Sequence, residues 1–255
     1  MPITELEWLR LLASFPVATP TLLASSELGR RTDIKFVLPL AATLEFIRQL
    51  RGDYAKLPGG AADGLAQYRT LYFDTENLEL FHAHRRGCRV RHKVRLRHYT
   101  DRQLSQLEIK TRRGENLTVK TRRPHAYGDN CLSAEDQAFV RSTTGITAVL
   151  QPQACTEYRR VTLIGLRHPE RVTIDFDLRF GTGNADVARA SVGMAVIEIK
   201  QARFRRDTPA MRRLRDSGFR PSWSSKYCAA IASTRPEVRR NRLLPGLRRL
   251  LPEVA

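Results

Sequence analysis

The stretch RVRHKVRLRHY, which runs from Arg89 to Tyr99, has a basic residue at every second position from Arg89 to Arg97. Successive side chains of a β-strand point to opposite faces of its sheet, so in a strand all five cations would share one face. Like charges on one face repel each other unless an anion lies among them. The pattern therefore predicts a strand that binds a polyanion, which can be a nucleic acid, an acidic membrane surface or a phosphate chain.

The distribution of charge supports the same conclusion. The chain of 255 residues has a formal net charge of +18, and the segment from Arg85 to Arg123 contributes +11, with fourteen Lys and Arg residues against three acidic ones. An excess so large and so local favours an anionic partner, although it says nothing about the fold. With 42% hydrophobic residues the chain can bury a full core, and we expect one main domain.

The four cysteines lie far apart and lack the paired spacing of zinc or redox motifs. We expect them to be reduced, which favours a cytoplasmic location. No apolar run is long enough to cross a bilayer, and acidic residues occupy the start of the chain where a secretory signal would be basic. The arginine-rich segment from Arg235 to Arg249 could touch an acidic surface, but we favour a solvated tail.

Alternation of apolar and polar residues predicts eight strands. They lie near residues 31–38, 69–75, 88–99, 104–111, 117–123, 156–164, 170–180 and 194–201. Helical spacing and end signals predict helices over 40–51 and 208–217, and a third helix that begins at Ser133. The fold class that follows is mainly β, with α-helices added.

The predicted strands have one charged face and one apolar face. In RVTIDFDLRF, for example, the five apolar residues from Val172 to Phe180 share one face and the charged residues share the other. An open sheet with a solvated face is one explanation. The other is a tunnel with charged side chains inside and an apolar outer face covered by helices, and we favour it because of the five alternating cations.

Nine short motifs follow one another along the chain, namely TDIKFVL, YRTLYFDT, VRLRHY, LEIKTRRG, TVKTR, YRR, VTIDFDL, VIEIK and SSKY. In this order they resemble the VTC domain, a family named for the vacuolar transporter chaperone polyphosphate polymerases, within the CYTH or triphosphate tunnel metalloenzyme superfamily. The resemblance covers residues 29–232, which leaves a helical N-terminal extension over 1–28 and a basic C-terminal tail over 233–255. It implies an eight-stranded antiparallel β-barrel that binds a triphosphate along its axis and a divalent cation near one end.

The resemblance also implies roles for individual basic residues. The residues implied to bind phosphate are Lys35, Arg95, Arg97, Lys110, Lys120, Arg160, Lys200, Ser225 and Lys226. Four of them are implied to act in catalysis, namely Arg95, Arg97, Lys110 and Lys226. These residue types suit the role, because arginine binds two phosphate oxygens at once and lysine acts as a point charge.

For the metal, Mn²⁺ or Mg²⁺, the resemblance points to Glu198, which matches the family's metal-binding glutamate. The first strand has Arg31 and Asp33 where the superfamily favours two glutamates. Glu198 is therefore the safer ligand, with Glu108 or Asp175 as a helper. A carboxylate is needed to hold the cation that bridges phosphate groups.

Three functions remain open from the sequence. The first is a polyphosphate polymerase that transfers the terminal phosphate of ATP to a polyphosphate chain, and the second is a tripolyphosphatase or nucleoside triphosphatase. The third is a module that binds polyphosphate or nucleic acid without catalysis, although carboxylates among the cations disfavour a specific nucleic-acid partner. Trp223 and Tyr227 could stack on a nucleobase, but such aromatics are more often packing residues.

Overall fold

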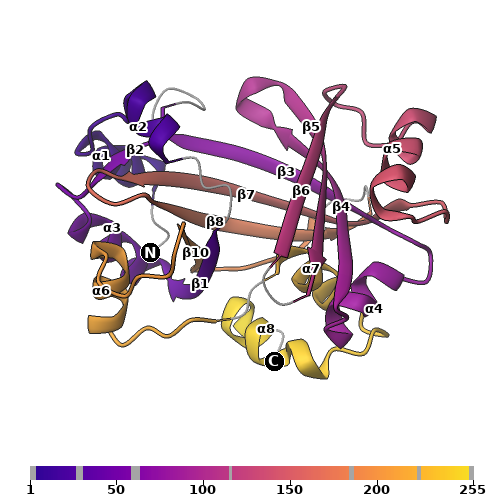
Figure 1. Cartoon of the computed structure of the whole chain (residues 1–255). Helices are drawn as coiled ribbons and strands as arrows, with labels where there is room; N and C mark the ends of the chain where they lie inside the picture. The colour runs from indigo at the N-terminus through magenta and orange to yellow at the C-terminus, as the bar shows by residue number, and fades with distance from the viewer. Residues whose placement is uncertain are drawn as a thin grey trace.

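The computed structural model describes residues 4–26, 31–58, 64–114, 117–183, 187–222 and 225–252. Within these ranges, ten strands form one antiparallel sheet (Figure 1). The strands are β1 (Thr32–Pro39), β2 (Tyr54–Lys56), β3 (Leu65–Asp74), β4 (Val90–Tyr99), β5 (Leu104–Arg113), β6 (Leu117–His125), β7 (Gln151–Gly165), β8 (Glu170–Thr182), β9 (Val187–Ala190) and β10 (Met194–Gln201). All eight predicted strands are present. The two that the sequence did not reveal, β2 and β9, have only three and four residues.

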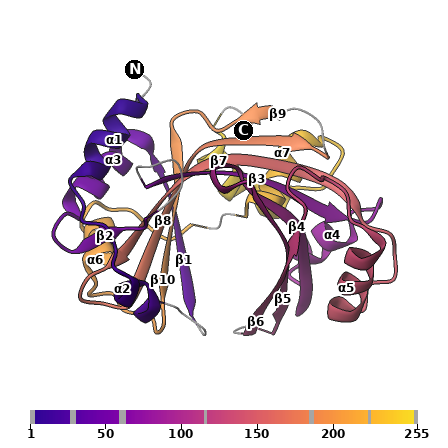
Figure 2. The ribbon, with the colours of Figure 1, turned by 90° about the horizontal axis from the view of Figure 1, so that it is seen from above.

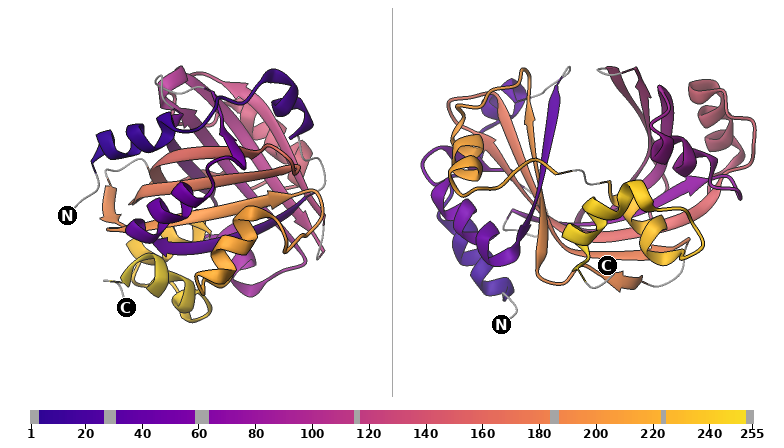
Figure 3. Two further views of the ribbon diagram at one scale, coloured as in Figure 1. Left: turned by 90° about the vertical axis from the view of Figure 1, so that its left-hand side faces the viewer. Right: turned by 90° about the horizontal axis from the view of Figure 1, so that it is seen from below.

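Eight strands form a continuous path in the order β1-β10-β8-β7-β3-β4-β5-β6, while β2 pairs with β7 and β9 pairs with β8. The sheet is strongly bent, and Figures 2 and 3 show that its edge strands, β1 and β6, lie apart from each other. We call the concave side of this bent sheet the trough. No pairing joins β1 to β6 in the described residues, so the prediction of a closed eight-stranded barrel is wrong. The edge strand β6 carries Lys120, Arg122, Arg123 and Pro124, and charges and proline protect an open edge from pairing.

Eight α-helices lie in the described ranges. They are α1 (Glu5–Ala13), α2 (Pro20–Ser25), α3 (Leu40–Gln49), α4 (Glu79–Arg86), α5 (Ala134–Thr144), α6 (Pro209–Asp216), α7 (Lys226–Thr234) and α8 (Leu244–Leu250), with short 3₁₀ helices η1 (Thr100–Arg102) and η2 (Asn241–Leu243). Three of them, α3, α5 and α6, are the predicted helices, and Ser133 forms the expected capping box with Asp136. None of the helices described here combines the length and the apolar character that a membrane crossing requires.

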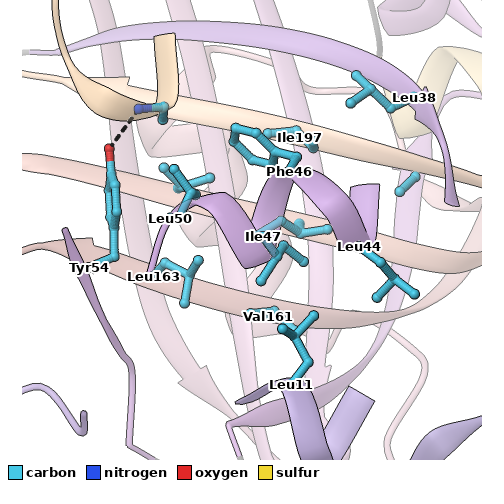
Figure 4. Packing of buried hydrophobic residues seen from close by; sticks show 14 of the residues in the cluster. Leu11, Leu38, Leu44, Phe46, Ile47, Leu50, Tyr54, Val161, Leu163 and Ile197 are labelled. Carbon is cyan, nitrogen blue, oxygen red and sulfur yellow. Dashed lines mark hydrogen bonds between the residues drawn. The ribbon is translucent and has the colours of Figure 1, made fainter. Parts of the chain in front are cut away.

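The helices α1, α3 and α6 cover the convex face of β1, β10, β8 and β7. In α3, Leu44 and Ile47 recur at helical spacing and pack against Val161 of this sheet (Figure 4). Trp8 of α1 stacks on Phe176 of β8, with 4.0 Å between the ring centroids. The N-terminal helix is therefore part of the main hydrophobic core.

A second apolar layer covers the convex face of β3, β4 and β5. Leu96 and Ile109 are fully buried there, together with Leu80 of α4 and Val140 of α5. Ile199 of β10 is buried in the first layer. The apolar side chains of the alternating strands therefore point outward beneath helices, and the opposite face of each strand forms the concave face of the trough.

The helices α7 and α8 lie across one end of the trough, as the yellow segment in Figure 3 shows. Tyr72 and Val196, on the concave face, pack with α7 in one cluster that also contains Leu247 and Leu250 of α8. The expectation of a solvated C-terminal tail is wrong, because these leucines recur on one face of α8 and are buried.

The strand β8 changes its apolar face halfway along. Asp177 has a left-handed backbone, with φ of 52°, and the pairing register with β7 shifts at this point. Val172 to Phe176 pack into the convex layer, but Leu178 and Phe180 belong to the cluster around α7. The prediction that all five apolar residues share one face is therefore wrong, because a β-bulge interrupts the alternation.

Candidate functional site on the concave face

The basic residues of β4 line the concave face. Arg91, Lys93, Arg95 and Arg97 alternate with residues that pack outward, and only Arg89 precedes the strand. Arg97 is 8% exposed although it is charged. Such burial is unfavourable for an isolated charge, so partners on neighbouring strands must compensate it.

Glu108 of β5 is the main partner of these arginines. It pairs directly with Arg95 across the two strands, and Arg95 Nη2 lies 2.6 Å from its carboxylate. Lys120 of β6 donates to the other oxygen at 2.5 Å, and Arg97 lies 3.8 Å away. Burial alone would raise the pKa of Glu108, but these three cations hold this pKa well below its usual range.

A second carboxylate, Glu198 of β10, lies between two lysines on the other side of the trough. Lys200 donates to Glu198 at 2.6 Å and to Thr173 Oγ1 at 2.9 Å, and Lys35 of β1 lies 3.6 Å from Glu198. Burial opposes ionisation of Glu198, but Lys200 and Lys35 lower its pKa well below the ordinary value. Burial also lowers the pKa of Lys200 to about 8, although Glu198 opposes this change.

Asp175 of β8 is the third paired carboxylate, and it brings in α7. Arg160 binds it through two nitrogens at 2.5 and 2.7 Å, and Lys226 from the first turn of α7 donates at 2.5 Å. Although burial opposes ionisation, Arg160 and Lys226 hold the pKa of Asp175 well below its usual range. Ser225, the N-cap of α7, accepts a hydrogen bond from Lys93 at 2.9 Å, which fixes this helix end to β4.

Three lysines lie side by side on adjacent strands of the concave face. Lys93, Lys110 and Lys120 occupy directly paired positions on β4, β5 and β6. Lys110 of β5 lies 3.8 Å from Asp33 of the edge strand β1, so an ion pair links the two walls of the trough. Burial is the main cause that lowers the pKa of Lys93 to about 7, and Lys35, Lys110 and Arg95 contribute to this change. Burial also lowers the pKa of Lys120 to about 8.

All eleven residues with predicted roles therefore lie on the concave face or at the start of α7. The ten charged residues among them, together with Lys93 and two more carboxylates, form the cationic cluster, whose members are Lys35, Lys93, Arg95, Arg97, Lys110, Lys120, Arg160, Lys200, Lys226, Asp33, Glu108, Asp175 and Glu198. It has nine basic residues and four acidic ones. The resemblance had not singled out Lys93, although the alternation on its strand already pointed to it.

The metal assignments remain predictions. In the described part of the chain, no three His, Cys, Asp or Glu side chains lie close enough together to form a ligand set. Glu198 and Glu108 belong to different walls of the trough, and each is paired with cations. Asp33 of β1 pairs with Lys200 of β10, and Glu198 of β10 pairs with Lys35 of β1, so these two carboxylates lie on adjacent strands.

Of the two aromatic residues near α7, Tyr227 is not available to stack on a base. Tyr227 is 2% exposed, and its hydroxyl donates to the buried Asp74. Its ring lies 5.1 Å from that of Tyr72. Tyr227 is therefore a packing residue, while Trp223 lies outside the described residues.

The described residues therefore form a bent antiparallel sheet with more cations than carboxylates on its concave face. The chain belongs to the VTC domain family, whose domain matches residues 30–235. The match includes every strand of the sheet and the N-terminal half of the α7–α8 region. The comparison with curated proteins found no match.

Solved structures show weaker likeness. The Hippeastrum protein HpAC1, described as having a dominant triphosphatase activity, is 14% identical, with 80% of this chain and 96% of that chain covered and a TM-score of 0.48. A proposed adenylate cyclase from Bacillus halodurans is 12% identical, with coverages of 76% and 92% and a TM-score of 0.45. Scores of this size support no inference about function, so the assignment rests on the family match.

Proposed function

We propose that the concave face binds a triphosphate or polyphosphate chain and that the protein transfers the terminal phosphoryl group of ATP to the end of a polyphosphate. The observation that carries this proposal is the row Lys93, Lys110 and Lys120. Like charges in directly paired strand positions destabilise a sheet. A bound phosphate chain removes this cost, because each phosphate oxygen accepts charge-assisted hydrogen bonds from lysine and arginine.

The arrangement supports phosphoryl transfer because such reactions depend mainly on positioning and on neutralising charge. Arg95 and Arg97 offer guanidinium groups to the phosphates, while Lys110 and Lys226 approach from β5 and α7. We assign these four residues to stabilise the charge that develops in the transition state. The remaining basic members of the cationic cluster hold the phosphate chain in line.

Transfer to a phosphate end is favoured over hydrolysis by the state of the carboxylates. Activation of water needs a general base whose pKa lies near the working pH. The pKa values of Glu108, Asp175 and Glu198 are all well below the ordinary value, because cations outweigh the effect of burial. A terminal phosphate is already ionised, so transfer to a polymer end requires no ionisable carboxylate as general base.

For a divalent cation, Mn²⁺ or Mg²⁺, the described part of the site offers two carboxylates and no larger group of protein ligands. Glu198 and Asp33 would hold it from one side, and phosphate oxygens would complete its shell, as is common for Mg²⁺. When bound, the cation would neutralise charge on the phosphates and bridge them. Lys35 and Lys200 already pair with Glu198, so they would turn toward the phosphates when the cation binds.

All four cysteines are free thiols, which suits a reducing compartment, and we place the activity in the cytoplasm, where ATP is available. Peripheral contact with an acidic surface through the arginines around α8 is compatible with this location. Leucines anchor α8, and Arg248 and Arg249 remain exposed.

The decisive experiment incubates the purified protein with ATP labelled in its terminal phosphate, Mn²⁺ and a short polyphosphate primer. Gel electrophoresis then separates free phosphate from labelled polymer. Label in the polymer supports the polymerase, and label only in free phosphate identifies a triphosphatase. Binding of polyphosphate without any transfer of label identifies a non-catalytic module, and the variant Lys110→Met should reduce the signal in each case.

A further inference from the structure

A row of aromatic and apolar side chains crosses four strands at one end of the cationic cluster. Tyr158 of β7 pairs with Tyr68 of β3, Tyr68 pairs with Tyr99 of β4, and Tyr99 pairs with Leu104 of β5. Tyr99, Leu104 and Tyr158 are separated from the basic residues of their own strands by an even number of positions, and Tyr68 pairs directly with two of them, so all four side chains lie on the same, concave face. We call these four residues the aromatic row.

The row has the surface that a flat ring needs. The rings of Tyr68 and Tyr158 are stacked with centroids 5.2 Å apart, and Tyr99 lies 5.2 Å from Tyr68 in a tilted arrangement. Tyr68 and Tyr99 are half-buried, and Leu104 is 40% exposed. Tyr158 forms the buried end of the row, so the accessible part lies at Tyr99 and Leu104.

The row is continuous with the phosphate-binding residues. The Arg97 guanidinium lies 5.5 Å from the ring centroid of Tyr68, and the Arg160 guanidinium lies 5.1 Å from the same ring. Arg97 precedes Tyr99 by two residues on one strand, a separation of about 7 Å. Arg95, one step further on the same face, is therefore about 14 Å from Tyr99 along the strand.

The accessible part of the row, Tyr99 and Leu104, lies at the end of β4 and β5 away from α7, while Lys226 of α7 lies 4.8 Å from the ring centroid of the buried Tyr158. At the other end of β4, Lys93 donates to the N-cap of α7, and the ring of His84 contacts Tyr227. A ligand with a flat apolar head and a charged tail would thus meet aromatic side chains first and cations further in. A nucleoside triphosphate has this form.

We propose that the aromatic row binds the base of a nucleoside triphosphate, with the base against Tyr99 and Leu104 and the phosphates on Arg97 and Arg95. The proposal rests on the proposed function, because it uses the same phosphate residues. It adds the subsite that distinguishes a nucleotide from inorganic triphosphate. It also sets a direction, since the nucleotide occupies the end with Tyr99 and the polymer extends toward Lys93 and α7.

The test compares two ligands that share the triphosphate. Isothermal titration calorimetry with Mn²⁺ gives the Kd of ATP and of tripolyphosphate for the parent protein and for Tyr99→Ala. Loss of a base-aromatic stack should weaken ATP binding by about 5- to 100-fold. Tripolyphosphate, which has no base, should bind with an unchanged Kd, and this also shows that the variant is folded.

Two further variants sharpen the result. Tyr99→Trp should retain or improve ATP binding, because the larger ring still stacks. Tyr127→Ala is the matched control: Tyr127 is 44% exposed but packs on His98, outside the concave face. It should change neither Kd.

The outcomes separate this inference from the proposed function. Selective loss of ATP affinity in Tyr99→Ala supports the subsite. If Tyr99→Ala loses affinity equally for both ligands, or for neither, the subsite is overturned but the phosphate site remains. A parent protein that binds tripolyphosphate but not ATP has the same consequence. A parent protein that binds neither ligand contradicts the proposed function itself.

Discussion

Each carboxylate of the cationic cluster has at least one basic partner, but the basic residues outnumber the carboxylates. Glu108 is 1% exposed and is contacted by Arg95, Arg97 and Lys120. By contrast, no carboxylate lies within ion-pair distance of Lys93 among the described residues, and the pKa of this lysine falls to about 7. At the residue scale, the charge of Lys93 therefore destabilises the empty protein but favours the binding of an anion.

The variant Lys93→Met should stabilise the empty protein by about 1–2 kcal/mol at pH 6, because it removes a charge that burial and neighbouring cations disfavour. The folded pKa of Lys93 is below the value of the unfolded chain, so the charge destabilises fully below about pH 7 and less as pH rises toward 10. The stabilising effect should thus be smaller at pH 9. Urea unfolding at the two pH values measures it, and an equal effect at both would contradict the assigned cause.

The variant Glu198→Gln should lower metal-dependent turnover by about 100-fold, since several kcal/mol of charge stabilisation depend on a cation bound there. The volume hardly changes, but Lys35 and Lys200 lose an ion-pair partner, so the melting temperature should fall while the protein stays folded. The labelled-phosphate assay over a range of Mn²⁺ concentrations measures the effect, with the exposed Asp216→Asn as control. Full activity of Glu198→Gln at saturating Mn²⁺ would show that another residue holds the metal.

At the scale of elements, α7 connects the core to the site. Its second residue, Tyr227, donates to Asp74, whose carboxylate also accepts from the backbone N–H groups of Leu80 and Phe81 in α4. Burial raises the pKa of Asp74, although these hydrogen bonds oppose the change. One buried carboxylate therefore holds the starts of α4 and α7 together, and so places Ser225 and Lys226 beside the concave face.

Removing the hydrogen bond between Tyr227 and Asp74 should loosen α7 without changing the charge of the concave face. We expect Tyr227→Phe to reduce the free energy of unfolding by about 1–2 kcal/mol, because it leaves a buried acceptor with one partner fewer. Hydrogen exchange should become faster in α7 and in the first turn of α4. Tyr127→Phe provides the control, and unchanged exchange in α7 would show that packing alone fixes this helix.

At the scale of the whole molecule, part of the net charge of +18 lies on the concave face of the bent sheet. The nine basic and four acidic residues of the cationic cluster leave an excess of five positive charges. Burial lowers the pKa of Lys93 to about 7, and of Lys120 and Lys200 to about 8. A bound polyanion opposes this change, because negative charge favours protonated lysine.

Binding of tripolyphosphate should therefore take up protons near pH 8 and almost none near pH 6, where these lysines are already charged. Calorimetry at pH 8 in two buffers with different ionisation enthalpies measures the uptake. Tripolyphosphate should also raise the melting temperature, and this shift should fall as salt is added. Binding without proton uptake at pH 8 would place the anion away from the three lysines.

Much of the site follows from the sequence, because the direction of a strand side chain is a local property. Alternation alone places Arg91 to Arg97 on one face of β4, and it places Ile109 and Ile199 on the apolar side of their strands. The motifs then identified the family. These features depend only on the spacing of residues along one segment, so they survive any arrangement of the segments in space.

Other features depend on contacts between distant segments. The row Lys93, Lys110 and Lys120 and the aromatic row follow from strand register, which bends and turns decide jointly. A left-handed Asp177 moved the end of β8 to the opposite apolar layer, and no local pattern marks that bulge. Closure of the sheet into a barrel also depends on the tertiary structure. Whether β6 meets β1 is decided by the curvature accumulated over the whole sheet, and here the two edge strands remain apart.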